Sequence, residues 1–401
     1  MKILQLCKKF PFPLKDGESI AVTYLAKGLY QLDCEVTLLA MNTTKHPVAV
    51  NRIRPKLKHY KAVHYTSLNN EVKPLHAFLN LFSSDSYNIS RFEDESFARR
   101  LRQLLRKEKY DLVQLESLYL TPYIDLIRSY SDAKIFLRAH NVEHEIWQRM
   151  AKNEENTVRS WYFDYSARKL KKYEIAQLKQ IDYLLPISAV DHKKFRKLGY
   201  KGPSKALPIG LDLHAFPFQQ VMPGEKLAIS FIGSLDWMPN IEALNWFVDR
   251  IWPHLNVIFP NLTLHIAGRN CPDWIHNLKI KNVTVHGEVP DSKAFLLKYP
   301  LSVVPLLSGS GMRAKILEAM ALGRVVISTK LGLEGIEAKD KKHLLVANNE
   351  EEFIRKIRFC YHHKKHLPSL SRNARRKVES EFDHLKIAQQ LVETFQGIPI
   401  N

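Results

Sequence analysis

The chain has 401 residues, 45% of them hydrophobic, and a formal net charge of +19, which is enough apolar content for two α/β domains with full cores. Its four cysteines form no C-x-x-C pair, which argues against a zinc site or a disulfide scaffold and fits a reducing compartment. The start, MKILQLCKKF, lacks the apolar segment of a signal peptide, and no run of about 18 apolar residues predicts a membrane-spanning helix.

The first half alternates strands with helices. A strand at 2–7 leads into a loop at 8–18 that contains two prolines and Gly17. Residues 43–93 show no firm period and are interpreted as helices and loops. The remaining predicted strands are 36–40, 111–116, 133–137 and 181–188, and the predicted helices are 19–32, 94–108, 121–130, 160–179 and a basic one at 191–199.

Charged residues follow the strand at 133–137. Arg138, His140 and Glu143 stand at its carboxyl end, the edge where open α/β sheets bind ligands. His140 and His144 have the spacing of helical zinc ligands, but His140 ends the strand and no third ligand is evident. We therefore expect no metal here, and a structural histidine is the alternative interpretation.

The second half repeats the rhythm after a Pro- and Gly-containing linker at 203–212. Four of its strands end at Gly233, Gly268, Gly287 and Gly309, which would let a ligand approach the backbone. The pattern predicts two doubly wound, Rossmann-like α/β domains facing a cleft, 1–205 and 206–383, with a helix at about 384–401 packing back on the first. The predicted strands are 227–233, 262–268, 283–287, 301–307 and 325–327, and the predicted helices are 240–252, 291–298, 312–323, 350–364 and 384–396.

The segment 301–337 carries the strongest signal. It reads as strand, Gly- and Ser-rich loop, helix and strand, and the loop at the helix N-terminus favours an anion. Lys315 and Glu318 share one helical face above it, where the cation suits a phosphate and the carboxylate suits vicinal hydroxyls. Two alternatives remain open: an ordinary i,i+3 ion pair, and the G-x-G-x-x-A dinucleotide fingerprint in Gly309–Ala314.

These residues resemble the donor domain of GT-B glycosyltransferases, family 4. The resemblance lies in FIGSLDWMPN (231–240), LHIAGR (264–269), VHGEV (285–289) and, most specifically, 305–336. The first half is also similar, through the loop with Gly17 and the segment 138–143. The resemblance implies a two-domain GT-B fold that holds a nucleotide-sugar donor in the second domain.

The resemblance also implies roles for individual residues. Glu318 would bind the ribose, and the segment at Glu288 would contact the base through its backbone. Arg313 and Lys315 would hold the diphosphate and, with His140, form the catalytic set. In many family members a first glutamate, eight residues before the second, touches the donor sugar; here that position is Ser310. The other donor-side residues are Gly233, Ser234, Arg269, Gly309, Ser310 and Gly311, and the acceptor side comprises Gly17, Glu18, Arg138 and Glu143.

The expected activity is metal-independent transfer of a sugar, with retention, from a UDP- or GDP-linked donor to a glycan or lipid-linked acceptor in surface polysaccharide or glycoconjugate biosynthesis. No cofactor or metal is expected. The alternatives are a non-catalytic sugar-nucleotide or glycan-binding partner of the same fold and a nicotinamide-dependent oxidoreductase. The base, the sugar, the acceptor, the linkage and the oligomeric state stay open.

The charge distribution suggests where the protein acts. Residues 1–200 hold 34 basic and 22 acidic side chains, a balance of +12 against +7 for the rest. Lys8, Lys9 and Lys15 flank Phe10 and Phe12 in the first loop, a pairing suited to a lipid headgroup region, and HKKFRK (192–197) adds to it. We expect a cytoplasmic protein with peripheral contact to an anionic membrane, and no nucleic-acid partner, since no stacking or helix-turn-helix motif is present.

Overall fold

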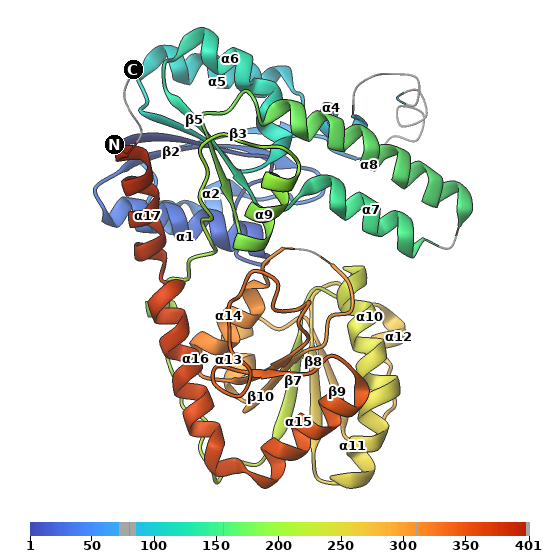
Figure 1. The fold of residues 1–401 in the computed structure, drawn as a ribbon. Coiled ribbons are helices and arrows are strands. Elements are labelled where there is room, and N and C mark those ends of the chain that lie inside the picture. The colour runs from blue at the N-terminus through green and yellow to red at the C-terminus, as the bar shows by residue number, and fades with distance from the viewer. Residues whose placement is uncertain (72–79, 81–85, 155, 310, 398–401) are drawn as a thin grey trace. The chain divides into compact units, whose positions relative to one another are not determined.

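The computed structural model describes residues 1–71, 80, 86–154, 156–309 and 311–397. They form two compact units, of which unit 1 comprises Met1–Gly210 and His384–Asn401 and unit 2 comprises Leu211–Asp383 (Figure 1). The division falls five residues beyond the boundary predicted at 205. Unit 2 is therefore one continuous segment, and unit 1 is made of the segments before and after it.

Unit 1 is built on a six-stranded parallel sheet with the strand order β3-β2-β1-β4-β5-β6. The order reverses direction at the β1–β4 pair, which makes the sheet doubly wound. Its strands are β1 (Lys2–Cys7), β2 (Glu35–Thr43), β3 (Ala62–Leu68), β4 (Leu112–Leu115), β5 (Lys134–Ala139) and β6 (Tyr183–Pro186). Its helices are α1 (Gly17–Gln31), α2 (Val50–Ile53), α4 (Tyr87–Ser90), α5 (Glu95–Lys107), α6 (Ile124–Tyr130), α7 (Glu143–Asn153), α8 (Thr157–Gln177), α9 (Ala189–Lys197) and α17 (His384–Gln396), with 3-10 turns η1 (Arg54–Leu57) and η3 (Leu118–Tyr123).

Local signals in the sequence set several helix starts in unit 1. Asp16 caps α1 by accepting from the backbone N–H of Ser19 at 2.9 Å, and Asp94 caps α5 by accepting from Phe97 at 2.8 Å. Strand β3, by contrast, lies where only helices and loops were expected. It is an edge strand whose residues are mostly half-exposed or exposed, so its sequence lacks the apolar run of a buried parallel strand. The part of that segment at 72–79 and 81–85 lies outside the described residues.

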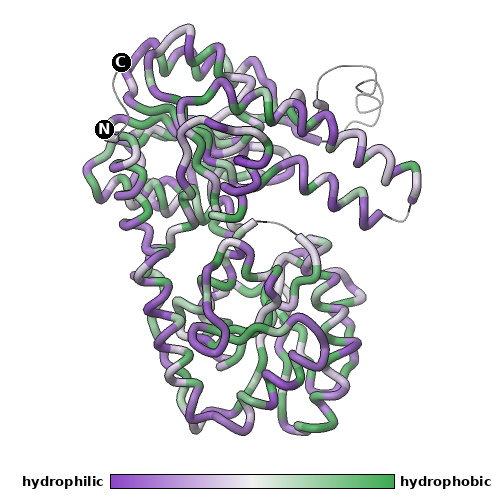
Figure 2. Tube along the Cα trace, viewed as in Figure 1, coloured by the Kyte–Doolittle hydropathy of each residue, from purple (hydrophilic) through white to green (hydrophobic). Residues whose placement is uncertain are grey.

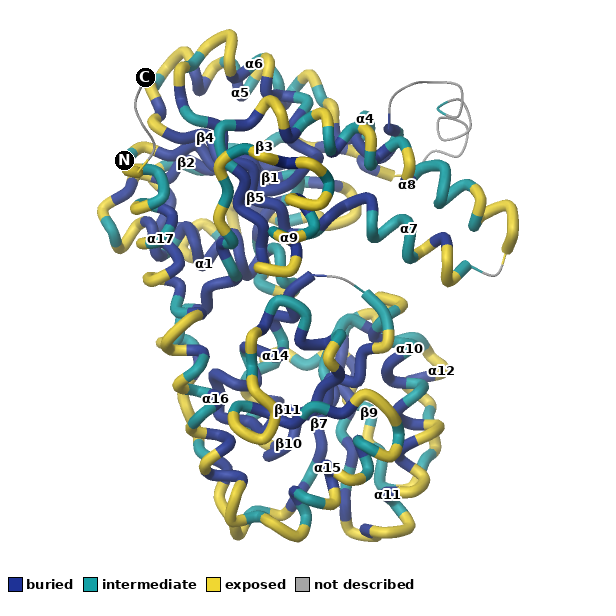
Figure 3. The backbone as a smooth tube through the Cα atoms, viewed as in Figure 1, coloured by how far each residue is buried: buried dark blue, intermediate teal, exposed yellow. Residues whose placement is uncertain are grey.

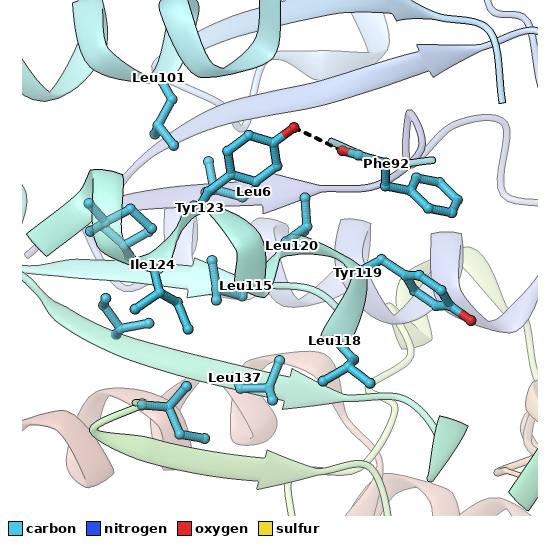
Figure 4. Close-up of a cluster of buried hydrophobic side chains, with 14 of the residues drawn as sticks. Leu6, Phe92, Leu101, Leu115, Leu118, Tyr119, Leu120, Tyr123, Ile124 and Leu137 are labelled. Atoms are coloured by element: carbon cyan, nitrogen blue, oxygen red, sulfur yellow. Dashed lines mark hydrogen bonds between the residues drawn. The ribbon is translucent and has the colours of Figure 1, made fainter. Parts of the chain in front are cut away.

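Apolar side chains fill both faces of the unit 1 sheet. One cluster includes Leu6, Leu115 and Leu137 from the central strands and extends under the turn η3 (Figure 4). Within it the hydroxyl of Tyr123 donates to the carbonyl oxygen of Phe92 at 2.8 Å, so this buried polar group has a partner. The opposite face carries a second cluster that includes residues of α1 and α17.

The last helix belongs to unit 1. Helix α17 packs along α1, and Ile387, Ala388 and Leu391 are fully buried there. The contact is close because α1 has a glycine at position 28. A Cβ atom there would come within 2.6 Å of the His384 carbonyl oxygen and 2.7 Å of the Ala388 Cβ.

Unit 2 has a second six-stranded parallel sheet, in the order β12-β11-β10-β7-β8-β9, with the same winding as the first. Its strands are β7 (Ala228–Ile232), β8 (Thr263–Ala267), β9 (Val283–Gly287), β10 (Leu301–Val304), β11 (Val325–Ser328) and β12 (Leu345–Val346). Its helices are α10 (Met238–Trp246), α11 (Trp252–Ile258), α12 (Asp273–His276), α13 (Ser292–Leu297), α14 (Ala314–Ala321), α15 (Glu350–His362) and α16 (Leu367–Glu381), with 3-10 turns η4 (Leu213–Ala215) and η6 (Lys364–His366).

The single helix predicted at 240–252 is in fact two. A π-helical turn, η5 (Phe247–Ile251), separates α10 from α11. Pro253 follows the turn and has no N–H for an α-helical bond to the residue four positions earlier, so the regular ladder cannot continue through it. Helix α16, between α15 and α17, was not anticipated.

Burial follows hydropathy in both units. Most inner strands are apolar and buried, the edge strands β3 and β9 are partly exposed, and polar and exposed residues lie mainly on the outer faces of the helices (Figure 2, Figure 3). None of the helices in the described part of the chain combines the length and the apolarity needed to cross a membrane.

Candidate functional site

The reversal point of the unit 2 sheet lies between β7 and β10. In doubly wound sheets ligands bind just beyond the carboxyl ends of the strands at this point, because the two following connections turn to opposite faces. The loop after β7 begins at Gly233, and the loop after β10 contains Gly309, Gly311 and Arg313 before α14 starts. The predicted donor-side motifs therefore meet at one place in the fold.

Lys315, from the first turn of α14, lies in this site. Its Nζ donates to the Asn240 Oδ1 at 2.7 Å and to the Ile232 carbonyl oxygen at 3.3 Å. Asn240 in turn donates to the Ser234 carbonyl oxygen at 2.8 Å, so one buried amide ties the lysine to the β7 loop. A Cβ atom on Gly233 would lie 2.7 Å from the Asn240 Nδ2, which leaves glycine as the residue that fits.

Arg313 is buried beside Lys315 and immediately precedes α14. Its Nη1 donates to the Gly311 carbonyl oxygen, and its guanidinium carbon lies 5.9 Å from the centre of the Trp237 ring. Gly309 and Gly311 have φ of +102° and +80°, a conformation that side chains rarely adopt, so these glycines allow the loop to fold under the arginine. Two cations thus converge at the sheet edge.

The loop after β8 contributes a third cation. The Arg269 Nε donates to the Ser234 hydroxyl at 2.8 Å, and that hydroxyl donates to Asp236. Asn270 donates to the other Asp236 oxygen at 2.7 Å. Burial raises the pKa of Asp236, but the bonds from Ser234 and Asn270 more than offset it, so the pKa lies below the usual value.

Glu318 lies one turn beyond Lys315 on α14, and both side chains are half-buried. Burial raises the pKa of Glu318 to about 7, although Lys293 and Lys315 oppose the shift. Burial and the neighbouring Arg313 lower the pKa of Lys315 to about 7. No hydrogen bond from a described residue satisfies the Glu318 carboxylate, so it is open to a ligand hydroxyl.

The rest of α14 anchors the site. Ile316, Ala319 and Met320 form a buried stripe on this helix. Gly323, two residues beyond the end of α14, has a φ of +79°, and the N–H of Arg324 donates to the Ala319 carbonyl oxygen at 2.8 Å. A Cβ on Gly323 would come within 2.7 Å of the Gln219 carbonyl oxygen, so this turn also requires glycine.

Two predicted donor-side residues, Glu288 and Ser310, are not among the contacts described above. Glu288 is exposed and follows the edge strand β9, although the adjacent Gly287 carbonyl accepts from the N–H of Gly268 at 2.8 Å. Ser310 lies outside the described residues. The roles of both stay predictions.

A buried polar cluster occupies the corresponding reversal point of unit 1, between β1 and β4. The Glu116 carboxylate, fully buried, accepts from the Gln5 Nε2 at 2.6 Å and pairs with the His140 Nε2 at 2.9 Å. Burial raises the pKa of Glu116, but Arg138 and His140 more than offset it, so the pKa lies below the usual value. An ionised Glu116 fixes the Nε2–H tautomer of His140 and leaves Nδ1 as its second polar atom.

Glu18 and Glu143 belong to the same cluster. Lys8 and Lys9 lie 3.4 and 3.7 Å from Glu18, and with His140 they hold its pKa below the usual value despite burial. Burial raises the pKa of Glu143, which accepts from the Tyr119 hydroxyl at 3.0 Å. Glu18 therefore lies near the His140 imidazole, and Glu143 lies near Glu18.

The other site residues predicted in the first half, Gly17 and Arg138, and the metal candidate His144 contact helices and backbone of unit 1. Gly17 is the first residue of α1. Arg138 is 0% exposed, and its guanidinium donates to the backbone carbonyls of Ala21 and Pro208 at 3.0 and 3.2 Å. His144 pairs with Glu174, and among the described residues no cluster of three or more His, Cys, Asp or Glu could hold a metal ion.

Part of the first-loop patch predicted for membrane contact does not lie at the surface. Phe10 is 2% exposed and packs in the core of unit 1, and Lys8 and Lys9 are ion-paired with Glu18 and Asp16. Phe12 is half-buried and Lys15 is exposed, so the loop presents only part of the predicted patch, and contact with a membrane stays a prediction.

Sequence reasoning missed Asn240 and Glu116 as site residues. Asn240 stands in the FIGSLDWMPN motif and Glu116 ends a predicted strand, so both positions carried a signal. Their partners, Lys315 and His140, lie 75 and 24 positions away in the sequence. Only the folded sheet brings each pair together.

Comparison with known proteins agrees with this geometry. Residues 226–363, which include the unit 2 site, match the family model described as glycosyl transferases group 1. A Klebsiella pneumoniae protein described as an uncharacterized 44.6 kDa protein in the cps region is 28% identical over 304 residues, covering 73% of each chain.

Solved structures share the fold over the whole chain. HepE of Anabaena in complex with UDP-glucose is 13% identical, with a TM-score of 0.66, and covers 99% of this chain and 100% of its own. Sucrose-phosphate synthase of Thermosynechococcus elongatus is 16% identical, with a TM-score of 0.70, and covers 99% and 98%. The chain therefore has the GT-B fold, two Rossmann-like units, as predicted.

Proposed function

We propose that this protein is a retaining glycosyltransferase of family 4 that transfers a sugar from a UDP- or GDP-linked donor to a hydroxyl of a glycan or lipid-linked acceptor, in surface polysaccharide or glycoconjugate biosynthesis. The observation that carries the proposal is the site on α14, where Lys315 and Arg313 converge beside the open carboxylate of Glu318. The family match over 226–363 and the cps-region relative support the same assignment.

The site suits a nucleoside diphosphate. Its two cations would hold the diphosphate, and Glu318 would accept hydrogen bonds from the ribose hydroxyls. Ligand binding would supply the negative charge that favours protonated Lys315 and the donors that favour ionised Glu318. Lys315 and Glu318, whose pKa values burial brings to about 7 in the free protein, would then both be charged.

The proposed chemistry follows from charge. Cleavage of the bond between the sugar and the phosphate builds negative charge on the leaving diphosphate. Lys315 and Arg313 are already positioned to stabilise it, and each such preorganised donor contributes about 3 kcal/mol. With retention, the acceptor hydroxyl attacks from the leaving-group face and the departing phosphate takes its proton. We expect no metal to be needed, because the protein itself supplies the positive charge.

The acceptor is assigned to unit 1. Its candidate contacts are Glu18, His140 and Glu143, which share the cluster beyond β1 and β4. His140, held by Glu116, would present its remaining nitrogen to the acceptor. Arg138 would act indirectly, because its bond to the Ala21 carbonyl fixes the backbone of α1.

The test is a panel of UDP- and GDP-sugars incubated with purified protein and a lipid-linked or soluble glycan acceptor, with release of nucleoside diphosphate as the readout. Glu318→Ala should weaken diphosphate binding by about 1.5–3 kcal/mol in calorimetry, because the ribose loses a charged acceptor. Chelator should leave turnover unchanged. Unaltered affinity in a folded Glu318→Ala variant would contradict the donor-site assignment.

A non-catalytic sugar-nucleotide-binding protein is the second candidate. It is favoured by the serine at position 310, where the resemblance leads one to expect a glutamate. Such a protein would bind nucleotide sugars and release no nucleoside diphosphate with any acceptor of the panel. Lys315→Ala separates the two, because in an enzyme it should lower turnover more than ground-state donor binding.

A further inference from the structure

A carboxylate from α10 borders the unit 2 site. The Ser308 hydroxyl, in the loop after β10, donates to the Glu242 Oε2. Glu242 is half-buried, and no Lys, Arg or His of the described residues lies within ion-pair distance of it. A carboxylate that forms no ion pair with a described residue, and accepts from one hydroxyl, has acceptor capacity left for another hydroxyl.

An aromatic ring lies at the start of the same helix. Trp237 immediately precedes α10 and is 40% exposed, a high value for an indole side chain. The loop passes directly against it, because a Cβ on Gly309 would lie 3.1 Å from the ring. The Arg313 guanidinium is 5.9 Å from the ring centre, so Trp237 borders the proposed phosphate position.

These contacts give the site residues a sequence along a bound nucleotide sugar. Glu318 and Lys315 lie on α14, Arg313 lies at its start, and Trp237 and Glu242 follow on α10 and its preceding residue. If the ribose lies at Glu318 and the diphosphate at Lys315 and Arg313, the group beyond the phosphates reaches Trp237 and Glu242. A sugar ring has an apolar C–H face that packs on an aromatic ring and hydroxyls that donate to a carboxylate.

We propose that Glu242, with Trp237, forms the donor-sugar subsite, and that Glu242 selects the sugar by accepting hydrogen bonds from its hydroxyls. The inference rests on the proposed function and deepens it: the ligand class is a nucleoside diphosphate linked to a sugar with free hydroxyls facing α10. Ser308 holds one carboxylate oxygen and leaves the other for the sugar.

A purely structural role for Glu242 is the competing explanation, since the bond to Ser308 also ties the loop to α10. Two variants separate the roles. Glu242→Gln keeps an oxygen that accepts from Ser308 but removes the charge. Ser308→Ala removes the tie but leaves the carboxylate. Glu351→Gln, an exposed carboxylate on α15, is the matched control.

The experiment is calorimetry on the full chain with UDP, GDP, UDP-glucose, UDP-galactose, UDP-N-acetylglucosamine and GDP-mannose. For the nucleotide sugar that the unmutated protein binds tightest, Glu242→Gln should weaken affinity about tenfold to a hundredfold and leave the parent nucleoside diphosphate within twofold. Trp237→Ala should act in the same direction, while Ser308→Ala and Glu351→Gln should change both ligands by less than threefold.

Loss of affinity for nucleotide sugar and nucleoside diphosphate to the same extent would overturn the inference in favour of a structural role. So would an unchanged nucleotide-sugar affinity in Glu242→Gln. Both results leave the proposed function standing. Absence of any nucleotide binding by the unmutated protein would instead overturn the proposed function, and the subsite with it.

Discussion

Lys315 and Glu318 are two titratable groups of opposite sign, and burial shifts the pKa of each toward 7. The pKa of each lies at about 7, lowered for the lysine and raised for the glutamate. A bound diphosphate favours the charged lysine, and bound ribose hydroxyls favour the charged glutamate. Donor affinity should therefore be coupled to proton exchange on both sides of neutral pH.

Diphosphate affinity should peak near pH 7. Above pH 7 the free protein holds Lys315 neutral, so binding must take up a proton and affinity falls by up to about tenfold per pH unit. Below pH 7 Glu318 is neutral and binding must release a proton. Calorimetry in two buffers of different ionisation enthalpy measures both exchanges, with proton uptake expected at pH 8 and proton release at pH 6.

Lys315→Arg should remove the alkaline limb, because the guanidinium stays charged, and Glu318→Gln should remove the acidic one. A flat affinity profile between pH 6 and pH 8 in the unmutated protein would contradict both assignments.

Glu116 is a buried carboxylate whose loss should affect stability as well as His140. Glu116→Gln leaves the fully buried Arg138 without its counter-charge, which costs about 3–5 kcal/mol at pH 7. The folded-state pKa of Glu116 lies below its usual value, so its contribution is present above the unfolded value and lost as pH falls through the folded one. Urea unfolding should show the difference from the unmutated protein shrinking as pH is lowered toward 3.

At the scale of elements, the close contact between α1 and α17 depends on the absence of a side chain at Gly28. Gly28→Ala should destabilise the protein by about 1–3 kcal/mol, because the added Cβ meets the His384 carbonyl at 2.6 Å. Gly224→Ala is the matched control, since a Cβ there meets nothing within 4 Å and should change the free energy of unfolding by less than about 0.5 kcal/mol. Equal effects of the two substitutions in urea unfolding would contradict the close packing.

Elements with a strong apolar signal could be predicted from sequence. Strands β1, β7 and β11 and helix α5 lie where periodicity placed them, within two residues. The elements that were missed carry weak signals. The edge strand β3 is half-exposed, β12 has two residues, and α16 has only a narrow buried stripe on a polar helix. Burial by other elements stabilises these segments, and sequence periodicity does not show it.

Some residues of the candidate site could likewise be predicted from sequence, and others could not. Residues contributed by one contiguous segment, such as Arg313, Lys315 and Glu318, could be named together from the loop and helix pattern. Asn240 and Glu242 could not, because each is defined by a bond to a residue 75 or 66 positions away. Such bonds depend on sheet order, which pairs β7 with β10.

For the whole molecule, the net charge of +19 still predicts attraction to anionic surfaces, and the basic segment 192–197, one part of the contact predicted from sequence, supplies exposed cations. On α9, Lys193, Arg196 and Lys197 are exposed, while Phe195 is buried. Any membrane contact through α9 should therefore be electrostatic, worth about 1 kcal/mol per cation near anionic lipid.

Co-sedimentation with anionic vesicles should be measurable at low salt and absent with neutral ones, and it should fade above about 0.3 M salt, where the Debye length falls below 6 Å. Replacing Lys193, Arg196 and Lys197 by Gln should reduce it. Equal sedimentation with neutral and anionic vesicles would contradict an electrostatic contact and leave the donor site unaffected.

The return of the chain at His384 makes unit 2 an insertion within unit 1. The two crossing points lie together: a Cβ on Gly210 would be 2.7 Å from the His384 Cα, and the Leu211 N–H donates to the Phe382 carbonyl oxygen at 2.7 Å. We therefore expect the chain to divide into two parts that fold on their own. Residues 211–383 should fold and bind nucleoside diphosphate on their own, and joining Gly210 to His384 through a short glycine linker should restore a closed, foldable unit 1.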